Sequence, residues 1–181
     1  MLTVQQALSV SPLTQAKVVA GTAGLSRQIS HVTIMEVPDL IQWLKGNDFI
    51  ITSLYCIKDN PDAQIKLIHD IARLGCAALA VKTNRYVKTL PTEMKAAANE
   101  LSFPLIDIPE HVTYIDIINP LMEQLLDHTA GVLRQADMAF RWLQEVILSD
   151  QGLEAALLTL QRLVGCDLTL ECPELGLLVS A

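Results

Sequence analysis

Nine polar side chains follow apolar segments of the chain, and their functional groups suit the binding of a small molecule. Lys82 and Arg85 carry positive charges that could hold an anion, and Tyr86 could stack on a planar ring. The hydroxyl groups of Thr52 and Ser53 could donate hydrogen bonds to carbonyl groups. The predicted ligand-binding residues are Glu36, Thr52, Ser53, Lys82, Thr83, Arg85, Tyr86, Glu110 and His111.

These side chains also have a purely structural interpretation, because the ends of strands generally carry polar residues. Lys82 and Arg85 could instead pair with Glu36, with Glu110 or with the C-termini of helices. The hydroxyl groups could cap helices instead of contacting a ligand. Both interpretations stay open from the sequence alone.

A catalytic interpretation would rest on Glu110 and His111 beside Asp107, whose carboxylates and imidazole could share a proton. A surface turn after Pro109 is the simpler account. The sequence shows no GxSxG, P-loop or HExxH signature, and it offers no base for Cys56. None of the four cysteines forms a CxxC pair with metal-ligand spacing. We therefore predict no catalytic residue, no metal site and no cofactor.

Apolar runs that alternate with helical patterns must position the polar side chains. Residues 32–37, 49–51, 77–81 and 105–108 read as strands, and helix-length segments connect the later ones. This alternation predicts an α/β fold with a mostly parallel sheet and helices on both faces. Parallel strands end at one edge of a sheet, where ligands commonly bind. The polar side chains are therefore expected to converge there.

Turn and cap residues predict several element boundaries. Asn60 and Pro61 mark the start of a helix over 63–74, and Gly75 marks its end. Asp39 is the expected N-cap of a short helix after Pro38. Residues 17–20 read as a strand that forms either a hairpin with the strand at 32 or a small extension of the sheet.

A long helix is predicted after Pro120, and its apolar residues are spaced alternately four and three apart. This heptad spacing indicates a coiled coil and a homodimer, although a third apolar row also suits a bundle or packing on a domain. The predicted dimerisation residues are Met122, Leu126, Leu133, Phe140, Leu143 and Ile147.

Composition limits the classes of partner. The formal net charge is −7, with 51% hydrophobic and 18% charged residues, which argues against a duplex DNA surface within these residues. No apolar stretch reaches membrane-spanning length, and the N-terminus does not resemble a signal peptide. We expect a cytoplasmic protein with reduced cysteines and no membrane partner.

The expected domains are an α/β domain over 1–120, a linker helix over 121–150, and the beginning of a second α/β-type domain over 151–181. The last segment holds a helix followed by alternating strand patterns at 167–171 and 177–179. Such a strand pair leaves unpaired edges. We therefore expect either a longer polypeptide or pairing within an oligomer.

Four segments carry a resemblance to a known family: VTIMEVPDL, WLKGNDFIITS, AALAVKTNRYVKTLP and FPLIDIPEHVTYIDIINPLM. Together they resemble the amino-terminal domain of PucR-like purine-catabolism regulators over roughly residues 4–125. The tail from residue 143 is similar to the start of that family's central sensor-like domain. The resemblance implies a transcription regulator with a helix-turn-helix domain beyond residue 181. A purine-derived metabolite would fit the polar side chains at the strand ends.

Three functions follow from these observations. The first is a regulatory region that senses a metabolite and dimerises. The second is an enzyme, or a degenerate enzyme, that uses the polar strand ends. The third is an assembly module without a ligand.

Overall fold

The computed structural model describes residues 1–148, 152–172 and 177–180 of the chain. These residues form two compact units, Met1–His128 and Thr129–Ala181. Among the described residues, no helix is both long enough and apolar enough to cross a membrane.

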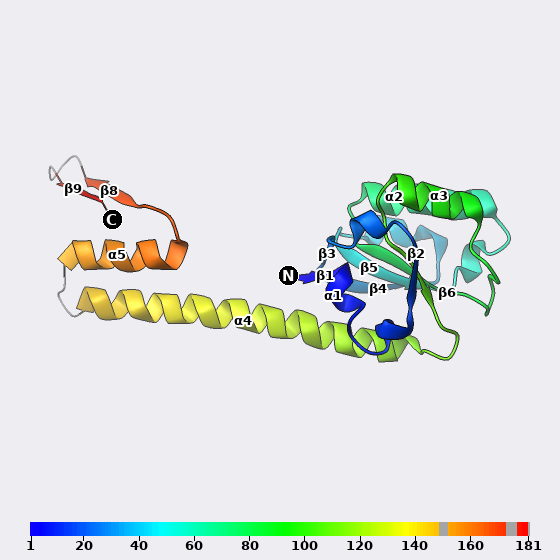
Figure 1. Cartoon of the computed structure of the whole chain (residues 1–181), viewed down its shortest axis with the longest axis horizontal. Coiled ribbons are helices and arrows are strands. Elements are labelled where there is room, and N and C mark those ends of the chain that lie inside the picture. Colours follow the sequence, from blue (N-terminus) through cyan, green and yellow to red (C-terminus); the bar gives the residue numbers. More distant parts are fainter. Residues whose placement is uncertain (149–151, 173–176, 181) are drawn as a thin grey trace. The chain divides into compact units, whose positions relative to one another are not determined.

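A five-stranded sheet with the order β2-β7-β6-β5-β4 forms the centre of the first unit (Figure 1). Four strands run parallel: β4 (His31–Met35), β5 (Asp48–Thr52), β6 (Ala78–Lys82) and β7 (Leu105–Ile108). The parallel α/β prediction is therefore confirmed. The carboxyl ends of these strands lie side by side, as the positions of their polar residues require.

Both faces of the sheet are covered because alternate side chains of each strand point in opposite directions. Ile50, Leu79 and Leu105 pack beneath α2 (Pro61–Arg73) and α3 (Thr92–Glu100). Ile51, Ala80 and Ile106 pack toward α1 (Val4–Ala7) and the first turns of α4 (Tyr114–Leu148). Figure 1 shows these helices on opposite sides of the sheet. Every residue of β5 and β6 is buried, which explains their nearly continuous apolar sequences.

The predicted boundaries of α2 are confirmed. Asn60 caps the helix by accepting a hydrogen bond from the Ala63 amide at 3.0 Å, and Pro61 occupies the first turn. The helix ends at Arg73, and Gly75 follows with a positive φ of 76°. Glycine tolerates this left-handed conformation without a steric penalty.

The expected strand at residues 17–20 forms, but its partner differs from a hairpin. β2 (Lys17–Ala20) runs antiparallel to β7, at the opposite edge of the sheet from β4. It therefore extends the sheet, as the second alternative predicted. A small separate ladder joins β1 (Leu2–Thr3) to β3 (Gln28–Ile29).

Two predicted helix starts are wrong. The short helix is a 3-10 segment, η3 (Pro38–Trp43), with Val37 in place of Asp39 at its N-cap. The long helix begins at Tyr114, so Pro120 lies inside it. The three other 3-10 segments described are η1 (Leu13–Gln15), η2 (Thr22–Gly24) and η4 (Tyr55–Ile57).

The second unit contains the end of α4, then α5 (Gly152–Val164) and a strand pair. β8 (Thr169–Cys172) runs antiparallel to β9 (Leu177–Ser180), with Leu170 opposite Val179. The two expected strands therefore pair with each other.

The Arg27 side chain connects the N-terminal segment to the residues that precede β6 and to those that follow α3. Its guanidinium donates hydrogen bonds to the carbonyl oxygens of Cys76 at 2.9 Å, Ser102 at 3.1 Å and Leu101 at 3.3 Å. It also lies over the Phe103 ring, 5.3 Å from the centroid. The adjacent turn fits closely, since a Cβ on Gly24 would lie 2.0 Å from the Ser102 oxygen. One side chain thus holds two turns that precede β6 and β7.

Replacing Arg27 by methionine should lower the free energy of unfolding by about 2 kcal/mol, because three carbonyl groups lose a charged donor. Chemical denaturation followed by circular dichroism measures the change. Arg73→Met is the matched control, since the Arg73 side chain is 81% exposed and pairs only at 3.5 Å with Asp70. Equal effects of the two substitutions would contradict the role given to Arg27.

Candidate functional site

An open cleft of about 430 Å³ lies at the carboxyl edge of the parallel strands. Side chains from the ends of β4, β5 and β6, from the loop after β6 and from the start of α4 form its walls. The lining residues are Ile34, Glu36, Ser53, Lys82, Arg85, Tyr86, Thr113 and Tyr114.

The carboxylate of Glu36 is the most constrained group in the cleft. Ser53 donates a hydrogen bond from Oγ to Glu36 Oε2 at 2.9 Å, and Tyr114 donates from Oη to Glu36 Oε1 at 2.9 Å. Each carboxylate oxygen thus has one protein donor and keeps further capacity to accept a hydrogen bond. This geometry joins the ends of β4 and β5 to the first residue of α4.

Lys82 lies at the base of the cleft and is only 8% exposed. Its ammonium group donates a hydrogen bond to the Val112 carbonyl at 2.8 Å, two residues before α4. It also lies 6.0 Å from the centroid of the Tyr114 ring, at the outer limit of a cation–π contact. Lys82 therefore contacts the segment that starts α4 from the end of β6.

Aromatic rings form the outer part of the site. The guanidinium of Arg85 lies 5.4 Å from the centroid of the Tyr86 ring. Tyr86 in turn contacts Tyr55, with ring centroids 4.6 Å apart and an interplanar angle of 59°. Tyr55 and Tyr86 are 53% and 43% exposed, so aromatic surface is available beside the cationic groups.

Five of the nine predicted ligand-binding residues line this cleft: Glu36, Ser53, Lys82, Arg85 and Tyr86. Their role as ligand contacts stays a prediction. The structural alternative of an ion pair between Lys82 or Arg85 and Glu36 does not occur in the described part of the chain, since neither cation has a carboxylate oxygen within 4.0 Å there.

The other four predicted residues have different surroundings. Thr52 is fully buried and donates to the Met35 carbonyl at 2.6 Å, so its hydroxyl ties β5 to β4. Thr83 donates to Asp107 at 2.6 Å. The Nε2 atom of His111 lies 2.9 Å from Gln15 Oε1. Glu110 is exposed and lies outside the cleft lining.

Three cleft residues were not predicted: Ile34, Thr113 and Tyr114. A sequence signal for the last two exists, because Thr113 and Asp116 have the spacing of a capping box. The Asp116 carboxylate accepts from the Thr113 amide at 3.1 Å, and the Thr113 hydroxyl accepts from the Asp116 amide at 3.4 Å. Hydrogen bonding to Thr113 lowers the pKa of the Asp116 carboxyl. This box fixes the helix start that the sequence interpretation placed too late.

Among the described residues, no cysteine lines the cleft. Cys56 lines a separate, smaller hollow, and burial raises the pKa of its thiol, which favours the unreactive protonated form. Among the residues that the structure describes, no group of three or more histidine, cysteine or acidic side chains could hold a metal ion.

The environment of Tyr114 has a measurable consequence. Burial, followed by the hydrogen bond and the charge of Glu36, raises the pKa of Tyr114 to about 12. The hydroxyl therefore stays protonated and donates to Glu36 throughout the physiological range. Because the unfolded pKa is lower, the stabilisation from this group is complete below the ordinary value near 10 and is lost as the pH rises toward 12.

In a spectrophotometric pH titration, we expect one of the three tyrosines to ionise with a pKa of about 12, well above the ordinary value. The Tyr114→Phe variant should lack the tyrosine that ionises with a pKa of about 12, whereas Tyr55→Phe should retain it. If this ionisation persists in Tyr114→Phe, the assignment to Tyr114 is contradicted.

The predicted dimerisation residues lie along α4. Met122, Leu126 and Phe140 are 40%, 63% and 61% exposed. The side chains of Leu133, Leu143 and Ile147 lie outside the described residues. Dimerisation itself stays a prediction.

Comparison with known proteins places this site in context. The model of the Purine catabolism regulatory protein-like family matches residues 6–125. The chain is 35% identical over 150 residues to the purine catabolism regulatory protein of Bacillus subtilis, covering 83% of this chain and 28% of that protein. It is 27% identical over 107 residues to the transcriptional activator PmfR of Paenarthrobacter nicotinovorans, covering 56% of this chain and 23% of that protein. The chain thus spans about a quarter of the length of these relatives. No solved structure matches it.

Proposed function

Since the chain belongs to the Purine catabolism regulatory protein-like family, we propose that it is the amino-terminal regulatory region of a transcription regulator. In this proposal the cleft binds a small purine-derived metabolite, and α4 transmits the occupancy of the cleft. DNA contacts belong to a domain outside these residues, because a net charge of −7 disfavours phosphate binding.

One observation carries the metabolite proposal. The Glu36 carboxylate, which accepts hydrogen bonds from two hydroxyl groups, lines the same cleft as Lys82 and Arg85. Neither cation has a carboxylate oxygen within 4.0 Å among the described residues. Such convergent and complementary groups are typical of ligand sites, where a few placed polar groups fix the orientation of the ligand. The name of the Bacillus subtilis relative supports a purine-derived ligand.

The position of Tyr114 supports coupling to α4. Tyr114 is the first residue of α4 and bonds to Glu36, while Lys82 bonds to Val112 just before the helix. A ligand that bonds to Glu36 or Lys82 therefore contacts the same side chains that hold the helix start. Its binding free energy then differs between arrangements of this segment, as regulation requires.

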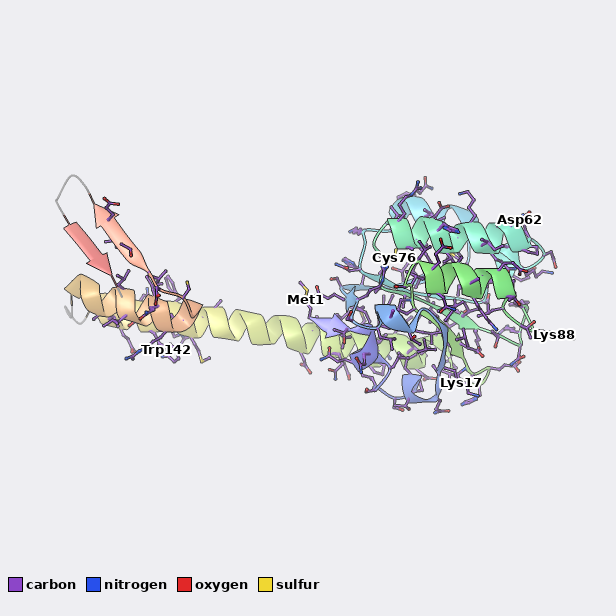
Figure 2. The ribbon with its side chains drawn as sticks, turned by 45° about the horizontal axis from the view of Figure 1, so that its top comes forward. Met1, Lys17, Asp62, Cys76, Lys88 and Trp142 are labelled. Carbon is purple, nitrogen blue, oxygen red and sulfur yellow. The ribbon has the colours of Figure 1, made fainter. Side chains whose placement is uncertain are left out.

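A thermal-shift screen of purine bases and their degradation products tests the metabolite proposal. A ligand at roughly 100 times its Kd should raise the Tm by about 5 °C or more, because it stabilises only the native state. Lys82→Met and Arg85→Ala should each reduce the shift. Lys88→Ala is the matched control, since Lys88 is exposed on the same loop and lies outside the cleft lining (Figure 2).

The outcome separates the proposed functions. The absence of a shift with every compound would favour an assembly module without a ligand. Turnover of a compound that depends on Lys82 would favour the enzyme alternative, although His111 bonds to Gln15 outside the cleft lining.

We also propose that α4 forms a homodimer. Leu126 and Phe140 are spaced by two heptads and are more than half exposed, and such apolar side chains are stabilised by packing against a second helix. Trp142 on the same helix is 52% exposed (Figure 2). A second copy of the chain offers the same heptad face, which a two-fold interface requires.

The double variant Leu126→Glu and Phe140→Glu should be monomeric at concentrations where the unchanged chain is dimeric, because it places like charges in the seam. Sedimentation equilibrium measures the association. Met138→Glu is the control, since Met138 is 48% exposed but lies off the seam. A monomeric unchanged chain well above micromolar concentration would contradict the dimer.

A further inference from the structure

We propose that the ligand of the cleft is a planar anion with ring N–H groups. Its negative charge pairs with Lys82 and Arg85, and its N–H groups donate to Glu36. The inference rests on the proposed sensing function and specifies the chemistry of the ligand.

Lys82 supports the negative charge of the ligand. An ammonium group has three donors, and only the bond to Val112 is present in the described part of the chain. The Lys82 residue is only 8% exposed, and its ammonium group has no carboxylate oxygen within 4.0 Å among the described residues. A charged group of low exposure is stabilised by a counter-ion, and an anion in the cleft would supply one.

Arg85 provides a second cation in the lining of the cleft. It is exposed and lies over the Tyr86 ring, so its guanidinium is orientated by an aromatic face. A guanidinium presents paired N–H groups that match a carboxylate or a delocalised oxyanion. Among the residues that line the cleft, the two cations Lys82 and Arg85 outnumber the one carboxylate, Glu36, although the whole chain is acidic.

Glu36 imposes a second requirement. Its carboxylate lines the same cleft and would repel an anion that had no donor groups. Ser53 and Tyr114 each occupy one lone pair of this carboxylate, which leaves acceptor sites for a ligand N–H. The two cations and one carboxylate therefore select a singly charged anion with N–H donors over a simple inorganic anion.

The aromatic groups favour a flat ligand. Tyr86 lines the cleft and is supported by Tyr55, and Ile34 adds an apolar side chain that is 40% exposed. A planar heterocycle could stack on these surfaces while its edge reaches the charged groups.

Isothermal titration calorimetry with urate and hypoxanthine tests the inference, because urate is an anion at neutral pH and hypoxanthine is neutral, while both are planar purines with N–H groups. We expect urate to bind at least about tenfold more tightly, and we expect this preference to shrink as salt is added. Orotate and uracil form a second pair that differs by one carboxylate group. The chain with both units is used throughout.

Variants assign the preference to the residues. Lys82→Met and Arg85→Gln should each lower the affinity for urate by a larger factor than the affinity for hypoxanthine, and Lys88→Ala should change neither affinity. Glu36→Gln should weaken both members of a pair. If the Lys82→Met variant does not fold, the Arg85→Gln variant tests the preference for the anion by itself, because Arg85 is exposed.

Each outcome has one meaning. Equal binding, or tighter binding of the neutral members, would overturn the anion inference but leave the sensing proposal standing. Binding of inorganic phosphate as tight as that of urate would overturn the role of Glu36. Failure of every compound to bind would count against the sensing proposal itself.

Discussion

Parallel strands that are buried on both faces can present polar side chains to water only at their ends. In this chain, β5 and β6 are buried along their whole lengths, and β4 and β7 flank them in the same direction. Polar groups that follow the strands must therefore gather at one edge. Ser53 and Lys82 come to the cleft for this reason, and the rest of the site is built around them.

The cleft joins parts of the chain that are far apart in sequence. Glu36 and Tyr114 are separated by 78 residues, and the hydrogen bond between them links the edge of the sheet to the start of α4. Lys82 makes a second link through Val112, 30 residues away. The cleft and the start of α4 thus share side chains, so a change in the contacts of one affects the other.

Local patterns predicted the sheet well because they depend on neighbouring residues alone. The apolar runs gave β5 and β6, and Asn60 and Gly75 bounded α2. The partner of β2 was not predictable in this way, because pairing with β7 depends on contacts between distant segments. Thr52 and Thr83 show the limit of local patterns in the candidate site. Both follow apolar runs in the sequence, yet their hydroxyl groups donate hydrogen bonds to the Met35 carbonyl and the Asp107 carboxylate. Tyr114 was missed because its role depends on a distant glutamate.

The edges of the sheet are unequal. Both β2 and β4 are outer strands, but β2 carries Lys17 and a register shift between Val18 and Ala20, whereas β4 pairs with β5 in a continuous register. β4 carries no lysine, proline or bulge, which are features that commonly prevent an outer strand from pairing with another molecule. Ile34 on β4 is partly exposed. Strand addition between molecules, whether during misassembly at high concentration or in aggregation, therefore has β4 as its natural starting point.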